Sequence, residues 1–128
     1  MREPEFFLDT SICIHVFAAV PEILRVRIEQ ADRGSLAISS IVLAELAIGL
    51  ERRGAERVQQ LERLLHVVQV LPFDDHAARI YGRLPFQRAS FDRLIAAHAL
   101  AADLTLVTAN AADFDKFTGL RVEDWTQA

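Results

Sequence analysis

Short apolar runs that alternate with helical patterns constrain the fold of this chain more than any other feature of its sequence. Four of these runs are bounded by polar or turn-forming residues, and a shorter fifth lies near the end of the chain. They are Phe6–Leu8, Leu36–Ile38, Val67–Pro72, Leu104–Thr108 and, as an edge strand, Leu120–Val122. Strands that alternate with helices predict an α/β fold in three α/β/α layers, with a mostly parallel central sheet of four to five strands.

Helical periodicity fills the segments between these runs. The predicted helices cover residues 11–19, 22–31, 40–49, 55–65, 75–81, 91–102 and 111–114. Their expected caps, which accept hydrogen bonds from free backbone N–H groups, are Ser11, Ser39 or Ser40, Asp74 or Asp75, and Asn110. The 128 residues contain no repeat, low-complexity stretch or linker, so we expect a single domain over residues 1–128.

The composition excludes some classes of function. A formal net charge of −4 argues against binding nucleic acid through bulk charge alone. Of the 14 basic residues all but Lys116 are Arg, which suits phosphate contacts but also follows amino-acid usage in some proteomes. The apolar segment 6–20 is interrupted by polar residues and is too short to span a bilayer. Cys13 is the only cysteine, which fits a reducing compartment, so we expect a soluble cytoplasmic protein with no membrane partner.

One carboxylate, Glu45, lies within an otherwise uncharged and mostly apolar run from Leu36 to Leu50. A run that is apolar on all sides predicts a buried helix. A lone carboxylate in such a helix costs free energy unless a cation or a hydrogen-bond donor meets it. Glu45 therefore either points outward at a bend or shares a cation with other acids.

Other acids lie next to the predicted strands. Asp9 directly follows the first strand, Asp92 opens the helix that leads into the fourth, and Asn110 and Asp113 follow that fourth strand. Ligands of open α/β sheets bind beyond the carboxyl ends of the strands, so adjacent parallel strands would bring these side chains together with Glu45. Clustered carboxylates repel one another unless a hard divalent cation such as Mg²⁺ or Mn²⁺ joins them, and such an ion supports phosphodiester hydrolysis.

Each of these side chains also has a purely structural interpretation. Asp9 could cap the helix that follows it, and Asp92 could complement a helix dipole. Asn110 with Asp113 matches a helix cap with an acid at the third position, and for this pair the structural interpretation is the stronger one.

Arginines flank one of the acids. Arg88 and Arg93 lie on either side of Asp92 and are candidates for holding RNA phosphates, although arginines on helix faces are commonly solvated. His98 lies on the same helix and receives no role.

The ordered set of motifs resembles the PIN-domain ribonucleases of the VapC toxin type. The segments that carry the resemblance are Phe7–Ser11, Ile38–Leu46 with Gly49, Val70–Asp74, Phe91–Ala99, Leu106–Asn110 with Asp113 and Phe114, and Leu120–Trp125. They cover nearly the whole chain in the right order. The resemblance implies a Mg²⁺- or Mn²⁺-dependent endoribonuclease, restrained by a cognate antitoxin, in a homodimer or a higher toxin–antitoxin assembly.

The resemblance also assigns roles by position. Asp9, Glu45 and Asp92 match the catalytic, metal-binding acids, and the fourth metal position falls between Thr108 and Asp113. Many members have Asp where this chain has Asn110, so that position passes to Asn110, to Asp113 or to a water molecule. The supporting residues are Thr10, Ser11, Thr108 and Asn110; Ser11 stands where Asn is usual. The stretch between Gly82 and Asp92 is shorter than the helical arm often found there.

Two other functions compete with RNA hydrolysis. A phosphotransfer enzyme would use Asp9 as its nucleophile, but Ser11 occupies the place of the second Asp and Lys116 is poorly placed for the required lysine. A catalytically weak PIN-fold module that only binds a partner protein or RNA is the alternative that Asn110 favours.

Overall fold

The computed structural model describes residues 3–85 and 89–127, and its centre is a five-stranded sheet. The strands are β1 (Phe6–Leu8), β2 (Leu36–Ser39), β3 (Gln69–Leu71), β4 (Thr105–Val107) and β5 (Val122–Glu123). Their order across the sheet is β3-β2-β1-β4-β5, and every pairing is parallel. This arrangement confirms the predicted α/β fold with five strands.

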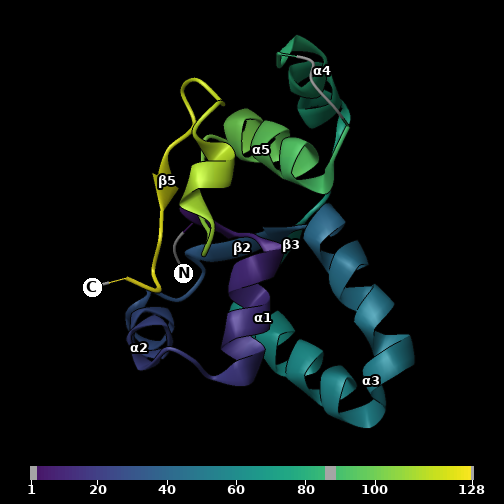
Figure 1. Cartoon of the computed structure of the whole chain (residues 1–128), viewed down its shortest axis with the longest axis vertical. Helices are drawn as coiled ribbons and strands as arrows, with labels where there is room; N and C mark the ends of the chain where they lie inside the picture. Colours follow the sequence, from purple (N-terminus) through teal and green to yellow (C-terminus); the bar gives the residue numbers. More distant parts are fainter. Residues whose placement is uncertain (1–2, 86–88, 128) are drawn as a thin grey trace.

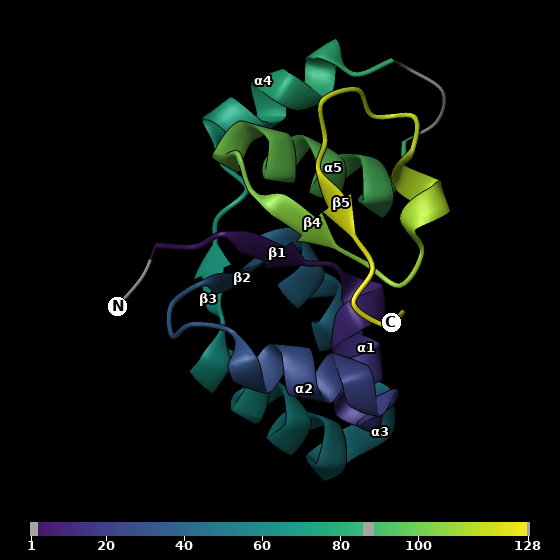
Figure 2. The ribbon, with the colours of Figure 1, turned by 90° about the vertical axis from the view of Figure 1, so that its left-hand side faces the viewer.

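Helices cover both faces of the sheet. On one face lie α1 (Thr10–Ala18), α2 (Glu22–Gln30) and α3 (Ser40–Val67), and on the other lie α4 (Asp75–Arg83), α5 (Phe91–Ala102) and the short 3₁₀ helix η1 (Ala111–Phe114). The same three layers are visible when the molecule is turned (Figures 1 and 2). Nearly all residues of β1, β2 and β4 are buried, which is why the sequence shows these strands as apolar runs.

Several element boundaries differ from the sequence prediction. Helix α3 takes up the two helices predicted at 40–49 and 55–65, with a kink at Gly54, whose φ of 61° and ψ of −142° are not helical. Only glycine adopts this backbone conformation readily, so Gly54 marks the turn between the two segments. Strand β3 begins at Gln69 because Val67 belongs to α3, and β5 begins two residues later than predicted.

The caps of two helices also differ from the prediction. Asp9, and not Ser11, is the N-cap of α1, since its side chain accepts a hydrogen bond from the backbone N–H of Ile12. Asn110 is the N-cap residue of η1 as predicted, but its side chain makes no capping hydrogen bond. Asp74 does cap α4 as predicted, and Ser39 caps α3.

Among the residues that the structure describes, no helix combines the length and the apolar character that a bilayer span requires. A single domain over residues 1–128 stays a prediction.

Candidate active site

The parallel pairing of β1 with β4 brings together two residues that are distant in the sequence. Leu8 pairs with Val107, so the residues that directly follow, Asp9 and Thr108, lie next to each other at the carboxyl end of the sheet. Both side chains are buried. The first residues after these two strands therefore meet, as expected for adjacent parallel strands.

Three groups hold the carboxylate of Asp9. Thr108 Oγ1 donates to Asp9 Oδ2 at 2.5 Å, while Ser11 Oγ and the N–H of Ile12 donate to Asp9 Oδ1 at 2.7 Å and 3.0 Å. Burial raises the pKa of Asp9, and these hydrogen bonds act in the opposite direction because they favour the charged form. The side chain is thus oriented in advance, with lone pairs still free on a carboxylate that water solvates poorly.

A second set of bonds ties the β4 end to the start of α1. Ser11 Oγ accepts a hydrogen bond from the N–H of Ala109 at 3.1 Å, and Thr108 Oγ1 accepts one from the N–H of Asn110 at 3.0 Å. Ser11 and Thr108 therefore position Asp9 while they satisfy the backbone of the loop after β4.

Glu45 lies in the second turn of α3, is half-buried, and contacts the first residue of α1. Thr10 Oγ1 donates a hydrogen bond to Glu45 Oε1 at 2.6 Å. Loss of hydration raises the pKa of Glu45, the charges of Asp92 and Asp9 raise it further, and the bond from Thr10 lowers it. The Glu45 carboxylate thus has a hydrogen-bond donor in Thr10 and lies within the electrostatic influence of the other two acids, which accounts for a charge in an otherwise apolar stretch of helix.

Asp92 occupies the first turn of α5 and is exposed. Partial loss of hydration raises its pKa, as do the charges of Asp9 and Asp113, whereas Lys116 lowers it. Solvent screens these charges at an exposed position. We call Asp9, Glu45 and Asp92 the acidic site, because they come from three elements and act on one another electrostatically.

The acidic site does not form a closed metal cage. Among the described residues, no three His, Cys, Asp or Glu side chains lie close enough together to hold a metal ion as they stand. The carboxylate oxygens of the acidic site are nevertheless the ligands that a hard divalent cation prefers. Burial raises the pKa of all three acids, and the charges of neighbouring acids raise those of Glu45 and Asp92, so a bound cation would relieve an unfavourable concentration of negative charge. Asp113 is exposed on η1 and contributes charge near Asp92.

The structure argues against the predicted phosphate contact of Arg93. Its side chain is buried, Nη2 donates to the carbonyl of Leu84 at 2.7 Å, and Nη1 donates to the carbonyl of Pro85. Its guanidinium also lies over the ring of Tyr81, 5.0 Å from the ring centre. Arg93 therefore joins α5 to the end of α4 and is not directed at a substrate. Arg88, the other predicted phosphate ligand, lies outside the described residues.

Sequence reasoning missed one contribution and was right to assign His98 no role. Lys116, considered only as a catalytic lysine for phosphotransfer, follows η1 and lowers the pKa of Asp92. Its position three residues after Asp113 was the available signal. His98 contacts Ser39 Oγ through Nδ1 at 2.8 Å and packs edge-on against Phe7 and Phe73, so it is a core residue.

Comparison with known proteins identifies the family of this chain. The chain matches the PIN domain family over residues 6–120. It is 36% identical to the tRNA(fMet)-specific endonuclease VapC of Shigella flexneri, over 95% of this chain and 98% of that protein. It is 32% identical to ribonuclease VapC2 of Rickettsia felis, over 94% of this chain and 97% of that protein.

Solved structures share the fold at similar identity. The chain superposes with a TM-score of 0.85 on a structure of DNA-bound VapBC from Salmonella typhimurium, at 32% identity, covering 95% of this chain and 98% of that one. The TM-score is 0.84, at 30% identity, for VapBC2 from Rickettsia felis bound to a DNA fragment from its promoter, covering 94% and 98%. The chain therefore belongs to the PIN-domain family, among its VapC-type ribonucleases.

Proposed function

We propose that this chain is a metal-dependent endoribonuclease and the toxin of a toxin–antitoxin pair, acting in the cytoplasm on RNA phosphodiester bonds. The observation that supports it most is Asp9, held by Thr108 and Ser11 at the carboxyl end of β1, whose charge helps to raise the pKa of both Glu45 and Asp92. Relatives named tRNA(fMet)-specific endonucleases make initiator tRNA the first substrate to test.

In this proposal each residue of the acidic site has a separate role. Asp9 and Asp92 are the main ligands of Mg²⁺ or Mn²⁺, with Asn110, Asp113 or water completing the set. Such an ion supplies activation of the attacking water and charge stabilisation at the phosphate. Glu45 ligates the ion or orients the water, and Thr10 fixes the rotamer of Glu45 through its hydrogen bond. A protein antitoxin restrains the enzyme, by analogy with the VapBC complexes that share its fold.

The test compares wild type with Asp9→Asn, using Mg²⁺- or Mn²⁺-dependent cleavage of transcribed initiator tRNA. Asn also serves as a helix N-cap, so the variant should keep α1 while it loses the charge. We expect a loss of at least about 100-fold in rate, of the size found when one essential catalytic interaction is removed. Asp75→Asn, at an exposed position on α4, should cleave like wild type. Full activity of Asp9→Asn would show that the assignment is wrong.

One alternative is kept because Asn110 stands where many relatives carry Asp. It is a catalytically weak module that binds a partner or RNA without cleaving it. Titration of Mn²⁺ by calorimetry separates the two functions. Binding that is lost in Asp9→Asn supports the nuclease, and no binding at millimolar Mn²⁺ supports the module.

A further inference from the structure

A large apolar ring is exposed next to one residue of the acidic site. Phe91 opens α5 directly before Asp92, and 49% of its surface is exposed. Among the described residues, every other Phe, Tyr and Trp side chain is buried or half-buried. Phe91 belongs neither to the hydrophobic core nor to the side chains packed against that core. Within the described part of the chain, no other aromatic ring and no cation stacks against its ring.

The start of α5 does not require a phenylalanine. Ser90 caps the helix by accepting a hydrogen bond from the backbone N–H of Arg93 at 3.1 Å. The core side of the helix is formed by other residues, namely Ile95, Ala96 and Ala99. Phenylalanine also favours a helix less than alanine or leucine does. The ring of Phe91 therefore contributes little to the fold and is available to a ligand.

A cation lies near the same acid but comes from another element. The helix η1 packs beside α5 (Figure 2), and Lys116 follows η1 two residues after its end. Lys116 is exposed, and its Nζ lies 5.5 Å from the ring centre of the buried Phe117. Its charge acts on Asp92. Among the described residues Lys116 forms no ion pair, so its ammonium group remains open to an anion.

An exposed ring and an open ammonium group beside Asp92 match the chemistry of one ligand, an unpaired nucleotide. Proteins bind single-stranded nucleic acid by stacking bases on aromatic side chains while cations contact the phosphates. Paired bases keep their faces inside the duplex, so only an unpaired base could reach the ring. The chain's formal net charge of −4 means that affinity for RNA has to come from such local contacts.

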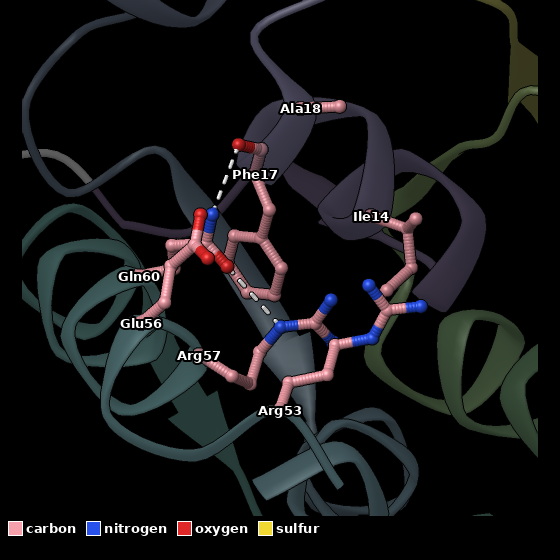
Figure 3. A pocket seen from close by; sticks show the side chains of 7 residues that line it. All are labelled: Ile14, Phe17, Ala18, Arg53, Glu56, Arg57 and Gln60. Carbon is pink, nitrogen blue, oxygen red and sulfur yellow. Dashed lines mark hydrogen bonds between the residues drawn. The ribbon is translucent and has the colours of Figure 1, made fainter.

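An open pocket of about 590 Å³ between α1 and α3 is a less suitable place for this nucleotide (Figure 3). Its lining includes none of the three acids, and the charge of Glu56 in its wall repels phosphate. Arg57 in that pocket is already engaged by the chain, because its Nε donates to Gln60 Oε1 at 3.2 Å and its guanidinium carbon lies 4.8 Å from the ring centre of Phe17. The surface around Asp92 is therefore the better candidate.

We propose that Phe91 and Lys116 form a nucleotide subsite beside Asp92, in which the ring stacks on an unpaired base next to the cleaved bond and the ammonium group binds the neighbouring phosphate. The subsite rests on the proposed function only for the position of the cleaved bond. Because stacking tolerates every base, the subsite selects an unpaired nucleotide and not a particular sequence.

The first test measures the affinity for transcribed initiator tRNA and for oligouridine by fluorescence anisotropy, in the Asp9→Asn background so that the RNA stays intact. We expect Phe91→Ala to weaken binding by about 10- to 100-fold, the range found when one base loses its aromatic partner. Phe91→Leu, which is apolar but has no aromatic face, should lose most of the affinity, and Phe91→Trp should retain it. Val58→Ala removes an exposed apolar side chain from α3 in the opposite layer and should bind like its parent.

The second test concerns the charge of Lys116. Removing one phosphate contact should reduce the slope of the logarithm of affinity against the logarithm of salt concentration by about 0.7 for single-stranded RNA. We expect this change in Lys116→Gln. Arg33→Gln is the matched control, because Arg33 is exposed before β2 and thus at the opposite edge of the sheet from the acidic site. It should leave the slope unchanged.

A third test locates the stacked base. An abasic nucleotide is placed on either side of the mapped cleavage position in the RNA. At one of these two positions the abasic RNA should bind as weakly as intact RNA binds to Phe91→Ala, and the two changes together should cause no further loss. Independent, additive losses at both positions would show that Phe91 does not stack on that base.

Two measurements exclude a loss caused by misfolding. Since Phe91 is exposed, the melting temperature of Phe91→Ala should match that of its parent. Phe91→Trp adds a fluorophore that RNA should quench, while Trp125, the only native tryptophan, is buried and gives a constant background. A signal that RNA does not quench would contradict stacking.

The possible results separate the two proposals. If wild type cleaves no RNA but Phe91→Ala still weakens RNA binding, only the nuclease assignment is wrong. If wild type cleaves RNA and folded Phe91→Ala and Lys116→Gln bind it as tightly as their parent, only the subsite is wrong. Unchanged RNA affinity with a loss of self-association would assign Phe91 to a protein contact and would also overturn the subsite. If the chain binds no RNA, both proposals are wrong.

Discussion

Asp9 combines two roles in one side chain. Its Oδ1 atom caps α1 by accepting the N–H of Ile12, and its Oδ2 atom accepts the hydroxyl of Thr108 across the sheet. The cap fixes where the helix starts, and the bond across the sheet fixes the rotamer. The structural and the functional interpretations of this residue are therefore not alternatives, because the bonds that cap the helix also orient the carboxylate.

Thr10 lowers the pKa of Glu45, and the pH dependence of RNA cleavage can detect this effect. Its hydrogen bond favours the charged form of Glu45, so Thr10→Val should raise the pKa of Glu45 further. Protons then compete with the metal up to a higher pH, and the acidic limb of the pH–rate profile for RNA cleavage should shift upward. NMR titration of the Glu45 side-chain carboxyl carbon measures the same change directly.

Two variants serve as controls for that experiment. Thr10→Ser keeps a hydroxyl at the same position and should restore the wild-type limb. Thr118→Val, at an exposed position in the loop before β5, should leave it unchanged. An unshifted limb in Thr10→Val would mean that the hydrogen bond does not control the ionisation of Glu45.

At the scale of elements, Arg93 joins two helices that the sequence leaves independent. It is on α5, and it donates to backbone carbonyls at the end of α4. These carbonyls have no helical partner beyond the last turn, so the guanidinium satisfies them and holds α4 against α5.

We expect Arg93→Met to lower the free energy of unfolding by about 1–3 kcal/mol, the typical cost of leaving such polar groups unsatisfied. The KM for RNA, measured well below the melting temperature, should stay within about twofold of wild type, because Arg93 does not face the substrate. Urea denaturation and steady-state cleavage give the two quantities.

Arg83→Gln is the matched control, since Arg83 is exposed in the last turn of α4. It should leave both the stability and the KM unchanged. A large rise in KM for Arg93→Met at unchanged stability would restore the phosphate role that the sequence suggested.

At the scale of the whole molecule, the acidic site opposes folding when no metal is bound. The pKa values of Asp9, Glu45 and Asp92 are raised above their ordinary values of 3.8, 4.5 and 3.8. A raised pKa means that the folded state holds the proton more tightly than the unfolded state does. Protonation of these acids therefore stabilises the folded state at a pH below their ordinary pKa values. This stabilisation is lost as the pH rises through their raised pKa values in the folded state.

Metal-free Asp9→Asn should therefore melt at a higher temperature than metal-free wild type at pH 7, and the difference should close as the pH falls toward 4. Added Mn²⁺ should reverse the order, since a ligand at 100 times its Kd stabilises the folded state by about 2.7 kcal/mol. Differential scanning calorimetry at several pH values, with EDTA or Mn²⁺, measures both effects. If wild type has a higher melting temperature than Asp9→Asn in EDTA at pH 7, the acidic site does not destabilise the metal-free protein and the prediction is wrong.

The sequence predicted more of the acidic site than of its surroundings. Asp9, Glu45 and Asp92 were identifiable because acids that interrupt apolar runs or follow strands are conspicuous. Arg93 was misinterpreted because its proximity to Asp92 in the sequence suggested a shared ligand, whereas the carbonyls that bind it come from α4.

By itself the sequence determined the alternation of strands and helices, the parallel class of the sheet and most helix boundaries, because periodicity and capping depend on residues a few positions apart. Only the tertiary structure decided the strand order, and with it the contact between Asp9 and Thr108, which lie 99 positions apart. It also decided that the guanidinium of Arg93 is occupied by backbone carbonyls at the end of α4. The partner of a long polar side chain is set by which element packs beside it, and local sequence does not contain that information.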